Sequence, residues 1–288
     1  MGDFMNFFKN FLKTKKGKII TVATVLLIVL VIRHFYNESL AFHTPSYEKK
    51  DISATLDKKN LTDKDFMFIF EQTGVSPGAA KNLIENGEAD TLLKLNDLYF
   101  EKPDFKKTYI AYPVTVEERN DSQVTPLADI QTGDILVTFN THTLDWRHGH
   151  CGLVLDAKKG LLLEHMALGQ TSCITRLSSW GEYPAFAVLR HPDSKISQKA
   201  AKYAQEHLID IEYNIFAGFF KKNKSDEDKP SSSHCSHIVW QAYKAQGVDI
   251  DNNKGIFVTP KNISRSKELK VVQIYGLNPK DYKSRILK

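Results

Sequence analysis

Two short apolar runs joined by a tight turn place the strongest constraint on the fold of this chain. They are HCGLVLD at 150–156 and LLLEH at 161–165, and Lys158-Lys159-Gly160 between them has the composition of a turn. Strands joined by so short a connection pair antiparallel. Further strand-like segments lie at 135–139, 171–176, 185–191 and 269–275, and helical patterns lie at 61–100, 197–208 and 235–247. We therefore expect an α+β fold in which an antiparallel sheet packs on helices.

Cys235 lies where the serine-rich run 231–233 gives way to an amphipathic helix. Ile238, Val239 and Ala242 follow it on one helical face, and the preceding serines are N-cap candidates. A cysteine in the first turn of a helix is close to unpaired backbone N–H groups and to the positive end of the helix dipole, which favour the thiolate. The position suits a nucleophile, but it suits a packed, unreactive thiol equally well.

His150 and Glu164 have the residue types that a thiolate hydrolase needs as base and as orienting group. In the first strand His150 shares a face with Gly152, and in the second Glu164 shares a face with Leu162. A carboxylate in an apolar strand needs a partner or a solvated edge, and a histidine on the paired strand would be such a partner. Each residue alone also fits an ordinary strand end, but together they favour a Cys235–His150–Glu164 triad.

Metal binding is the alternative from another class of site, because histidines are plentiful near these strands. No pair among the 10 histidines and 3 cysteines has the C-x-x-C or H-x-x-x-H spacing typical of zinc sites. We therefore expect no metal and no cofactor. The odd, low cysteine count argues against a disulfide scaffold. Cys151 and Cys173 are expected to be packed thiols, and a disulfide between them is the alternative.

Residues 19–32 form an uncharged apolar run, IITVATVLLIVLVI, between Lys18 and Arg33. The run is shorter than the roughly 20 residues that usually span a membrane, but flanking interfacial residues can lengthen it. Lysines precede it, which by the positive-inside rule places the N-terminus in the cytoplasm. We expect an uncleaved single-pass anchor in the cell membrane, with residues 34–288 outside the cytoplasm. A signal peptide cleaved near Ser39-Leu40-Ala41 is the alternative.

Composition predicts four parts: a basic tail and anchor at 1–36, a polar linker at 37–60, a small helical unit at 61–118 and a strand-rich catalytic domain at 119–288. In the helical unit, Thr62 with Asp65 and Ser76 with Pro77 predict two helix starts, and Gly74 predicts a helix end. The net charge of +5 is concentrated in the first 18 residues. The remainder is close to neutral, so nothing in it demands a nucleic-acid partner.

The order of these motifs resembles the circularly permuted papain-like cysteine hydrolases of the NlpC superfamily, the YiiX/YycO-like group. The resemblance covers roughly 123–276 and is carried by GDILV, HCGLVL, LLLEH, FAVLRHP, Tyr213-Asn214, HCSHIVWQAYKAQGVD and Val258-Thr-Pro260. It implies Cys235 as nucleophile, His150 as base and Glu164 as orienting acid, with Tyr213 and Asn214 bordering the substrate cleft. His234 and His237 depart from the family pattern, and either could compete with His150 as the base.

The resemblance implies a thiol-dependent amidohydrolase or peptidase at the cell envelope. The anchor and the helical unit are similar to what membrane-attached members from Gram-positive bacteria carry, so peptide amide bonds of peptidoglycan are the expected substrate. A hydrolase or acyltransferase acting on lipid-linked acyl groups is the first alternative. A non-catalytic scaffold that binds envelope partners through the charged loop 221–229 and the helical unit is the second.

Overall fold

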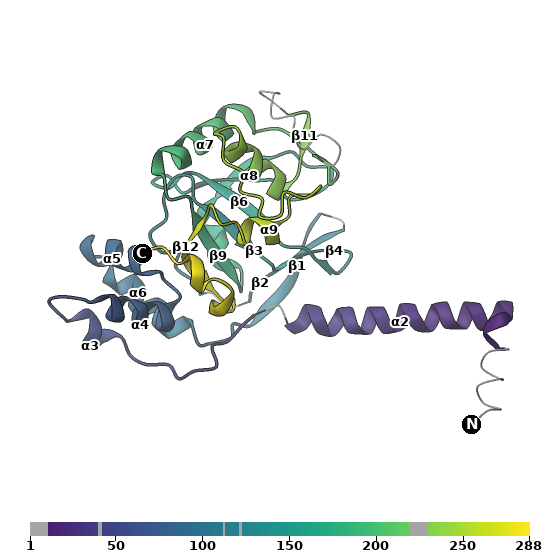
Figure 1. Ribbon diagram of the computed structural model, residues 1–288, viewed down its shortest axis with the longest axis horizontal. Helices are drawn as coiled ribbons and strands as arrows, with labels where there is room; N and C mark the ends of the chain where they lie inside the picture. The colour runs from purple at the N-terminus through teal and green to yellow at the C-terminus, as the bar shows by residue number, and fades with distance from the viewer. Residues whose placement is uncertain (1–10, 40–41, 112, 121–122, 219–229) are drawn as a thin grey trace. The chain divides into compact units, whose positions relative to one another are not determined.

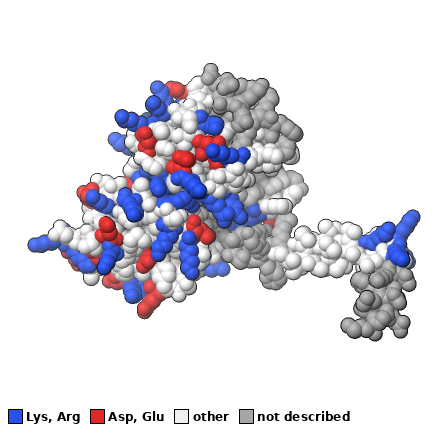
Figure 2. Space-filling view, viewed as in Figure 1, with Lys and Arg blue, Asp and Glu red and all other residues white. Residues whose placement is uncertain are grey.

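The computed structural model describes residues 11–39, 42–111, 113–120, 123–218 and 230–288, and it divides into two compact units, 1–41 and 42–288. In the first unit, helix α2 (Lys15–Ser39) contains the apolar run 19–32, whose large apolar side chains are exposed. Figure 2 shows this uncharged stretch in white, with lysines at its N-terminal end. Among the described residues no helix is long and apolar enough to cross a membrane, so the anchor expected at 19–32 is not found there.

The second unit is built around a six-stranded sheet in which every neighbouring pair of strands is antiparallel (Figure 1). In spatial order the strands are β12 (Lys270–Tyr275), β9 (Phe186–Arg190), β3 (Ile135–Thr138), β6 (His150–Asp156), β7 (Leu161–Glu164) and β8 (Cys173–Arg176). The expected α+β class is confirmed. The hairpin expected from the two apolar runs is formed by β6 and β7, with Leu153 opposite Leu163.

Helices cover both faces of this sheet. Side chains of one parity, including Ile135, Leu153 and Leu163, pack in a cluster with α7 (Ser194–His207) and α8 (Cys235–Lys244). Side chains of the other parity, including Leu136 and Leu162, pack in a second cluster with α4 (Asp63–Thr73), α5 (Pro77–Glu85) and α6 (Ala89–Leu98). A sheet buried on both sides requires near-continuous apolar strands, as these are. The helices expected to form a separate small unit therefore share a core with the sheet.

Local capping signals set the starts and ends of α4 and α5 as expected. Thr62 and Asp65 form a reciprocal capping box at the start of α4, and Gly74 ends that helix in the left-handed conformation with φ of 74°. A Cβ at Gly74 would also lie 2.0 Å from the Ile274 carbonyl oxygen, so the position demands glycine on two grounds. Ser76 caps α5, and Pro77 occupies its first turn.

The remaining elements are a second sheet, a pair of two-residue strands and several short helices. A second sheet contains β1 (Phe105–Ala111), β2 (Val114–Arg119), β4 (Thr141–Thr143) and β5 (Trp146–Arg147), and β10 (Glu212–Tyr213) pairs with β11 (Ser232–Ser233) in parallel. Short helices are α3 (Ser53–Leu56), α9 (Pro260–Ser264), and the 3₁₀ turns η1 (Leu177–Glu182), η2 (Pro279–Asp281) and η3 (Lys283–Arg285). Residues 141–149, between β3 and β6, thus contain β4 and β5.

Within the segment 37–60, which we expected to be a polar linker, several of the residues 42–60 pack on the core. Ile52 is fully buried in the cluster with α4–α6. The backbone is fixed as well, because His43 N–H donates to the Gly276 carbonyl at 2.8 Å and Asn96 Nδ2 donates to the Lys50 carbonyl at 3.1 Å. Buried Ile52, the partly buried Phe42 and Leu56 and a few hydrogen bonds to the backbone hold a segment whose sequence has no periodic pattern.

Replacing Ile52 with alanine tests this packing. We expect Ile52→Ala to lower the free energy of unfolding by about 2–5 kcal/mol, the usual cost of truncating a buried aliphatic side chain. Lys59→Ala, an exposed change in the same segment, is the control and should stay within about 0.5 kcal/mol of the unchanged chain. Both values come from denaturant unfolding. Equal, negligible effects would show that the segment does not pack.

Candidate functional site

The ends of three elements bring the predicted triad residues together. His150 is the first residue of β6, Glu164 is the last residue of β7, and Cys235 is the first residue of α8. In an antiparallel hairpin the start of one strand lies beside the end of the next, which places His150 next to Glu164. Helix α8 packs against β6, and this contact brings Cys235 to His150.

Glu164 is held by three hydrogen-bond donors in a buried environment. His150 Nε2 lies 2.9 Å from Oε1, Trp180 Nε1 donates to the same oxygen at 3.0 Å, and the Thr175 hydroxyl donates to Oε2. Burial alone would raise the pKa of Glu164, but the hydrogen bonds and charge of His150, with help from Thr175 and Trp180, lower it. Glu164 is therefore an ionised carboxylate with its acceptor capacity directed at the histidine.

His150 is oriented on two sides. Its bond to Glu164 uses Nε2, which leaves Nδ1 for the thiol, and its ring stacks on Trp180 with centroids 5.7 Å apart and planes at 22°. Burial alone would lower the pKa of His150, but hydrogen bonds and charges from Cys235 and Glu164 raise it to about 10. The arrangement favours an imidazolium between two anions.

The Cys235 thiol is the matching anion. Burial alone would raise its pKa, but hydrogen bonds and charges from His150 and His234 lower the pKa well below that of an ordinary cysteine. By contrast, burial raises the pKa of Cys151 well above its usual value. Of the three cysteines, all within the described residues, only Cys235 therefore has surroundings that favour the thiolate. All three cysteines are free, Cys173 is exposed and Cys151 is buried, so the alternative of a Cys151–Cys173 disulfide does not hold.

The serines before Cys235 do not cap its helix, contrary to the sequence prediction. The N-cap is His234, whose extended backbone has φ of −145° and ψ of 172°, and its side chain makes no capping hydrogen bond. Ser232 and Ser233 instead form β11. The backbone N–H of Cys235, at the start of α8, therefore receives no capping hydrogen bond from the His234 side chain.

The two histidines that flank Cys235 have different surroundings. His234 bears directly on the thiol, as its effect on the thiol pKa shows. The His237 ring stacks on Trp240 with centroids 5.4 Å apart, its Nδ1 lies 3.0 Å from Ser233 Oγ, and a Cβ at Gly218 would come within 2.6 Å of its Nε2. His237 is thus packed among α8 and its neighbours, and it is the weaker competitor for the role of base.

Tyr213 and Asn214, expected at the border of a cleft, differ in their relation to the thiol. Burial raises the pKa of Tyr213, and the charge of Cys235 raises it further, so Tyr213 is a neutral phenol close enough to sense the thiolate. Asn214 is exposed, and its side chain serves a local turn by accepting from Phe216 N–H at 2.9 Å and donating to Ser232 Oγ at 3.3 Å. Asn214 therefore stabilises a local turn, whereas Tyr213 interacts electrostatically with the Cys235 thiolate.

Sequence reasoning missed Trp180, Thr175 and His165. Glu164 pairs with Cys173 across β7 and β8, so strand parity alone could have placed Thr175 on the face of Glu164. No pattern marks Trp180, which reaches the site from η1. His165 is buried and contacts Tyr213 edge to face at 4.9 Å; burial lowers its pKa to about 4, so the ring is neutral near pH 7.

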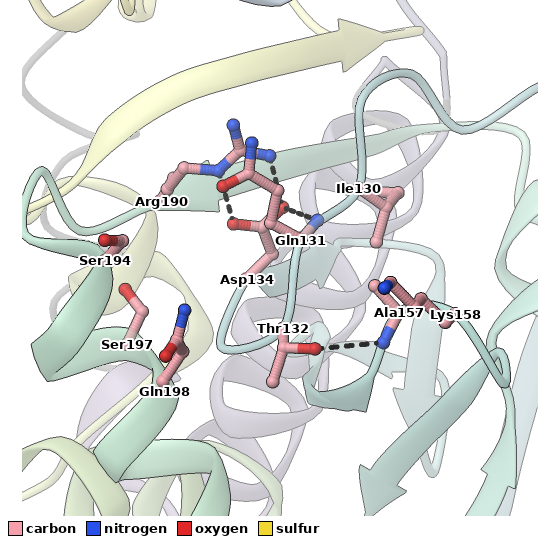
Figure 3. Close-up of a pocket in the computed structure, with 10 residues that line it drawn as sticks. All are labelled: Ile130, Gln131, Thr132, Asp134, Ala157, Lys158, Arg190, Ser194, Ser197 and Gln198. Carbon is pink, nitrogen blue, oxygen red and sulfur yellow. Dashed lines mark hydrogen bonds and ion pairs between the residues drawn. The ribbon is translucent and has the colours of Figure 1, made fainter.

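Two other features, a possible metal cluster and a separate pocket, were considered as candidate sites among the described residues. Among the described residues no group of three or more His, Cys, Asp or Glu could hold a metal ion. A pocket of about 270 Å³ lies elsewhere, lined by the turn before β3, by β9 and by α7 (Figure 3). Its buried charges neutralise each other, because Arg190 Nε and Nη2 donate to the two oxygens of Asp134 at 2.8 Å and Nη1 donates to Asp129. Burial raises the pKa of Asp134, and Arg190 opposes that rise.

Comparisons of the chain with protein-family models, with curated proteins and with solved structures found no match.

The pH dependence of alkylation tests the thiolate. Because the pKa of Cys235 is depressed, the thiolate persists below the ordinary cysteine pKa of about 8.5. We expect the rate of Cys235 alkylation by iodoacetamide to stay flat from pH 8 into the acid range and to fall only as pH drops through the depressed pKa. Peptide mass spectrometry identifies the modified residue. A tenfold fall in rate for each pH unit below 8 would show an unperturbed thiol.

Glu164→Gln tests the orienting carboxylate. Loss of its charge should lower the pKa of His150 by about 1–3 units, because a neighbouring opposite charge is removed. The imidazolium that stabilises the thiolate should therefore be lost at a lower pH, and the alkylation profile should change on its alkaline side. Glu182→Gln, a change of the same kind at an exposed position, should leave the profile unchanged. An unaltered profile in Glu164→Gln would remove Glu164 from the triad.

Proposed function

We propose that this chain is a thiol-dependent amidohydrolase or peptidase with a permuted papain-like fold. The observation that carries the proposal is the buried row of Cys235, His150 and Glu164, in which the pKa of the thiol is lowered and that of the imidazole is raised. A structural cysteine packed in a core would have a raised pKa, as Cys151 does. The chain order, with the base and acid on a hairpin ahead of the nucleophile helix, agrees with the permuted family.

The proposed reaction has two halves. The Cys235 sulfur attacks the carbonyl carbon, a C–S bond forms, and the carbonyl π electrons move to oxygen. The tetrahedral species collapses to a thioester as the C–N bond breaks, and the His150 imidazolium gives its proton to the leaving amine. His150 then takes a proton from water, whose oxygen attacks the thioester and releases the acid and the thiolate. Glu164 keeps the ring oriented and stabilises its positive form.

Peptide amide bonds of peptidoglycan are the first substrate class that we propose. Support comes from the family resemblance and from the predicted location at the cell membrane, with the site outside the cytoplasm. The exposed apolar side chains of α2 from Ile19 to Ile32 agree with a segment that contacts lipid or another apolar partner. Fractionation of the full-length protein, followed by protease protection of intact cells, tests this location. Recovery in the soluble fraction without detergent would contradict it.

Lipid-linked acyl groups are the second substrate class, and a specific feature favours them. Leu168, Ile215 and Phe216 are 64%, 53% and 65% exposed on two loops beside Tyr213. These loops are tied together by a hydrogen bond from Tyr213 N–H to the Gln170 carbonyl at 3.2 Å. An acyl chain entering next to the thiol could cover such side chains.

The third function, a non-catalytic scaffold, was proposed to use the charged loop 221–229, which lies outside the described residues.

Product analysis distinguishes these functions. Full-length protein in detergent is incubated with muropeptides and, separately, with diacylated phospholipids, and products are identified by mass spectrometry. We expect cleavage of a muropeptide amide bond that Cys235→Ala abolishes. His150→Ala should lower turnover by several orders of magnitude, because the nucleophile and base act as a unit. Cys173→Ala, an exposed cysteine on β8, is the matched control and should retain activity.

Release of fatty acid in place of an amide product would favour the lipid-directed function. A protein that turns over neither substrate and whose Cys235 resists iodoacetamide would support the non-catalytic scaffold instead.

A further inference from the structure

His234 presents a buried hydrogen-bonding atom beside the nucleophile that the proposed triad does not use. The residue is 7% exposed and stabilises the thiolate, yet among the described residues its buried Nε2 atom has no neighbour with full hydrogen-bond geometry. Its other nitrogen, Nδ1, lies 3.4 Å from Ser236 Oγ. A buried polar atom left unpaired costs about 1–3 kcal/mol, and such a cost is typical of a site whose missing partner is a ligand.

A second general base is a poor description of this histidine. A catalytic base needs an acceptor that orients it and stabilises its charge, and His150 has such an acceptor in Glu164. In the described part of the chain no hydrogen bond or ion pair joins His234 to a carboxylate. Its side chain interacts with Ser236, Cys235 and the His237 ring. What His234 can offer in either protonation state is an N–H donor.

The reaction creates a need for such a donor. When sulfur attacks a carbonyl, negative charge moves to the carbonyl oxygen, and fixed donors aimed at that oxygen lower the barrier. The Cys235 backbone N–H, in the first turn of α8, is one donor that the helix itself does not use. His234 is the residue immediately before it and bears on the same sulfur atom. The Cys235 N–H and the buried His234 ring thus belong to adjacent residues, one of which carries the atom at which the new bond forms.

We propose that His234 is a catalytic residue that donates a hydrogen bond to the oxyanion, together with the Cys235 backbone N–H. This role rests on the proposed thiol hydrolase function and assigns the second donor that the reaction requires. It also accounts for the unpartnered nitrogen, because the partner is the carbonyl oxygen of the substrate. No proton leaves His234 during the reaction, so His150 remains the only group that exchanges protons with the leaving group and water.

Comparing two reactions of the same thiol separates this role from a general effect on the thiolate. Alkylation by iodoacetamide displaces iodide at a saturated carbon and forms no oxyanion. Acylation by p-nitrophenyl acetate forms the tetrahedral oxyanion and releases p-nitrophenolate, which is followed as a burst of absorbance. The ratio of the acylation rate to the alkylation rate, measured on the full-length protein, therefore reports support of the oxyanion and cancels changes in thiolate content.

We expect His234→Phe to lower this ratio by about 10²–10³-fold, the usual cost of removing one oxyanion donor. His234→Gln keeps a side-chain N–H and should recover at least a tenfold part of the loss. His237→Gln is the matched control, since it makes the same change at a buried histidine of α8 that packs on Trp240, and it should leave the ratio unchanged. Circular dichroism confirms that each variant is folded.

An unchanged ratio in a folded His234→Phe variant overturns the proposal. A fall in the ratio for Tyr213→Phe but not for His234→Phe also overturns it, by assigning the donor to the phenol beside the thiol. Failure of the proposed function gives a different result, because wild-type Cys235 would then resist both reagents. Wild-type protein that is alkylated rapidly but never acylated retains the thiolate and overturns the oxyanion role.

Discussion

The hydrogen bond between His150 and Glu164 is the interaction on which the rest of the site depends. Burial acts against the charged form of every member of the row: it raises the pKa of Cys235 and Glu164 and lowers that of His150. Each charge therefore exists only because its neighbours are charged. Trp180 and Thr175 complete the hydrogen bonding of the carboxylate, so that Glu164 can be ionised away from water. Removing Glu164 would leave an imidazolium with a single counterion.

Sheet register keeps this row together. His150 lies opposite Thr138 on β3, and Glu164 lies opposite Cys173 on β8, so the two residues are placed by pairings on both sides of the hairpin. A slip by one residue would turn Cys151 to the face of His150 and would reverse every apolar contact of β6. Because helices cover both faces, such a slip exchanges residues between two different cores. The packing that stabilises the fold thus also fixes the base against the acid.

Sequence could predict the parts of the site that depend on local pattern. The β6–β7 hairpin, the parity of His150 and Glu164 and the helix that begins at Cys235 all follow from spacing over a few residues. Trp180 could not be predicted, because a 3₁₀ turn has no periodic signal that points to a distant carboxylate. The packing of segment 42–60 could not be predicted for a related reason, since Ile52, Phe42 and Leu56 contact the core without any periodic spacing.

The different surroundings of His234 and His237 are a second feature of the site that sequence pattern alone could not predict. The two residues lie three positions apart at the start of α8 and contact each other with ring centroids 5.4 Å apart. Helical spacing alone makes them near neighbours on one side of the helix. His234, however, precedes the first helical turn with an extended backbone, so helical periodicity does not govern where its ring lies. Only tertiary packing, in which Ser233, Trp240 and Gly218 enclose His237, separates the two.

The reactivity of the Cys235 thiol depends on two kinds of contact, one within the β6–β7 hairpin and one between α8 and β6. The acid and base pair within one hairpin, whereas Cys235 reaches them only through docking of α8 on β6. In a chain whose helix has not docked, Cys235 lacks His150 as a counterion, and its thiol has an ordinary pKa. The charged row thus forms as a product of tertiary packing, and a reactive thiolate marks the folded unit.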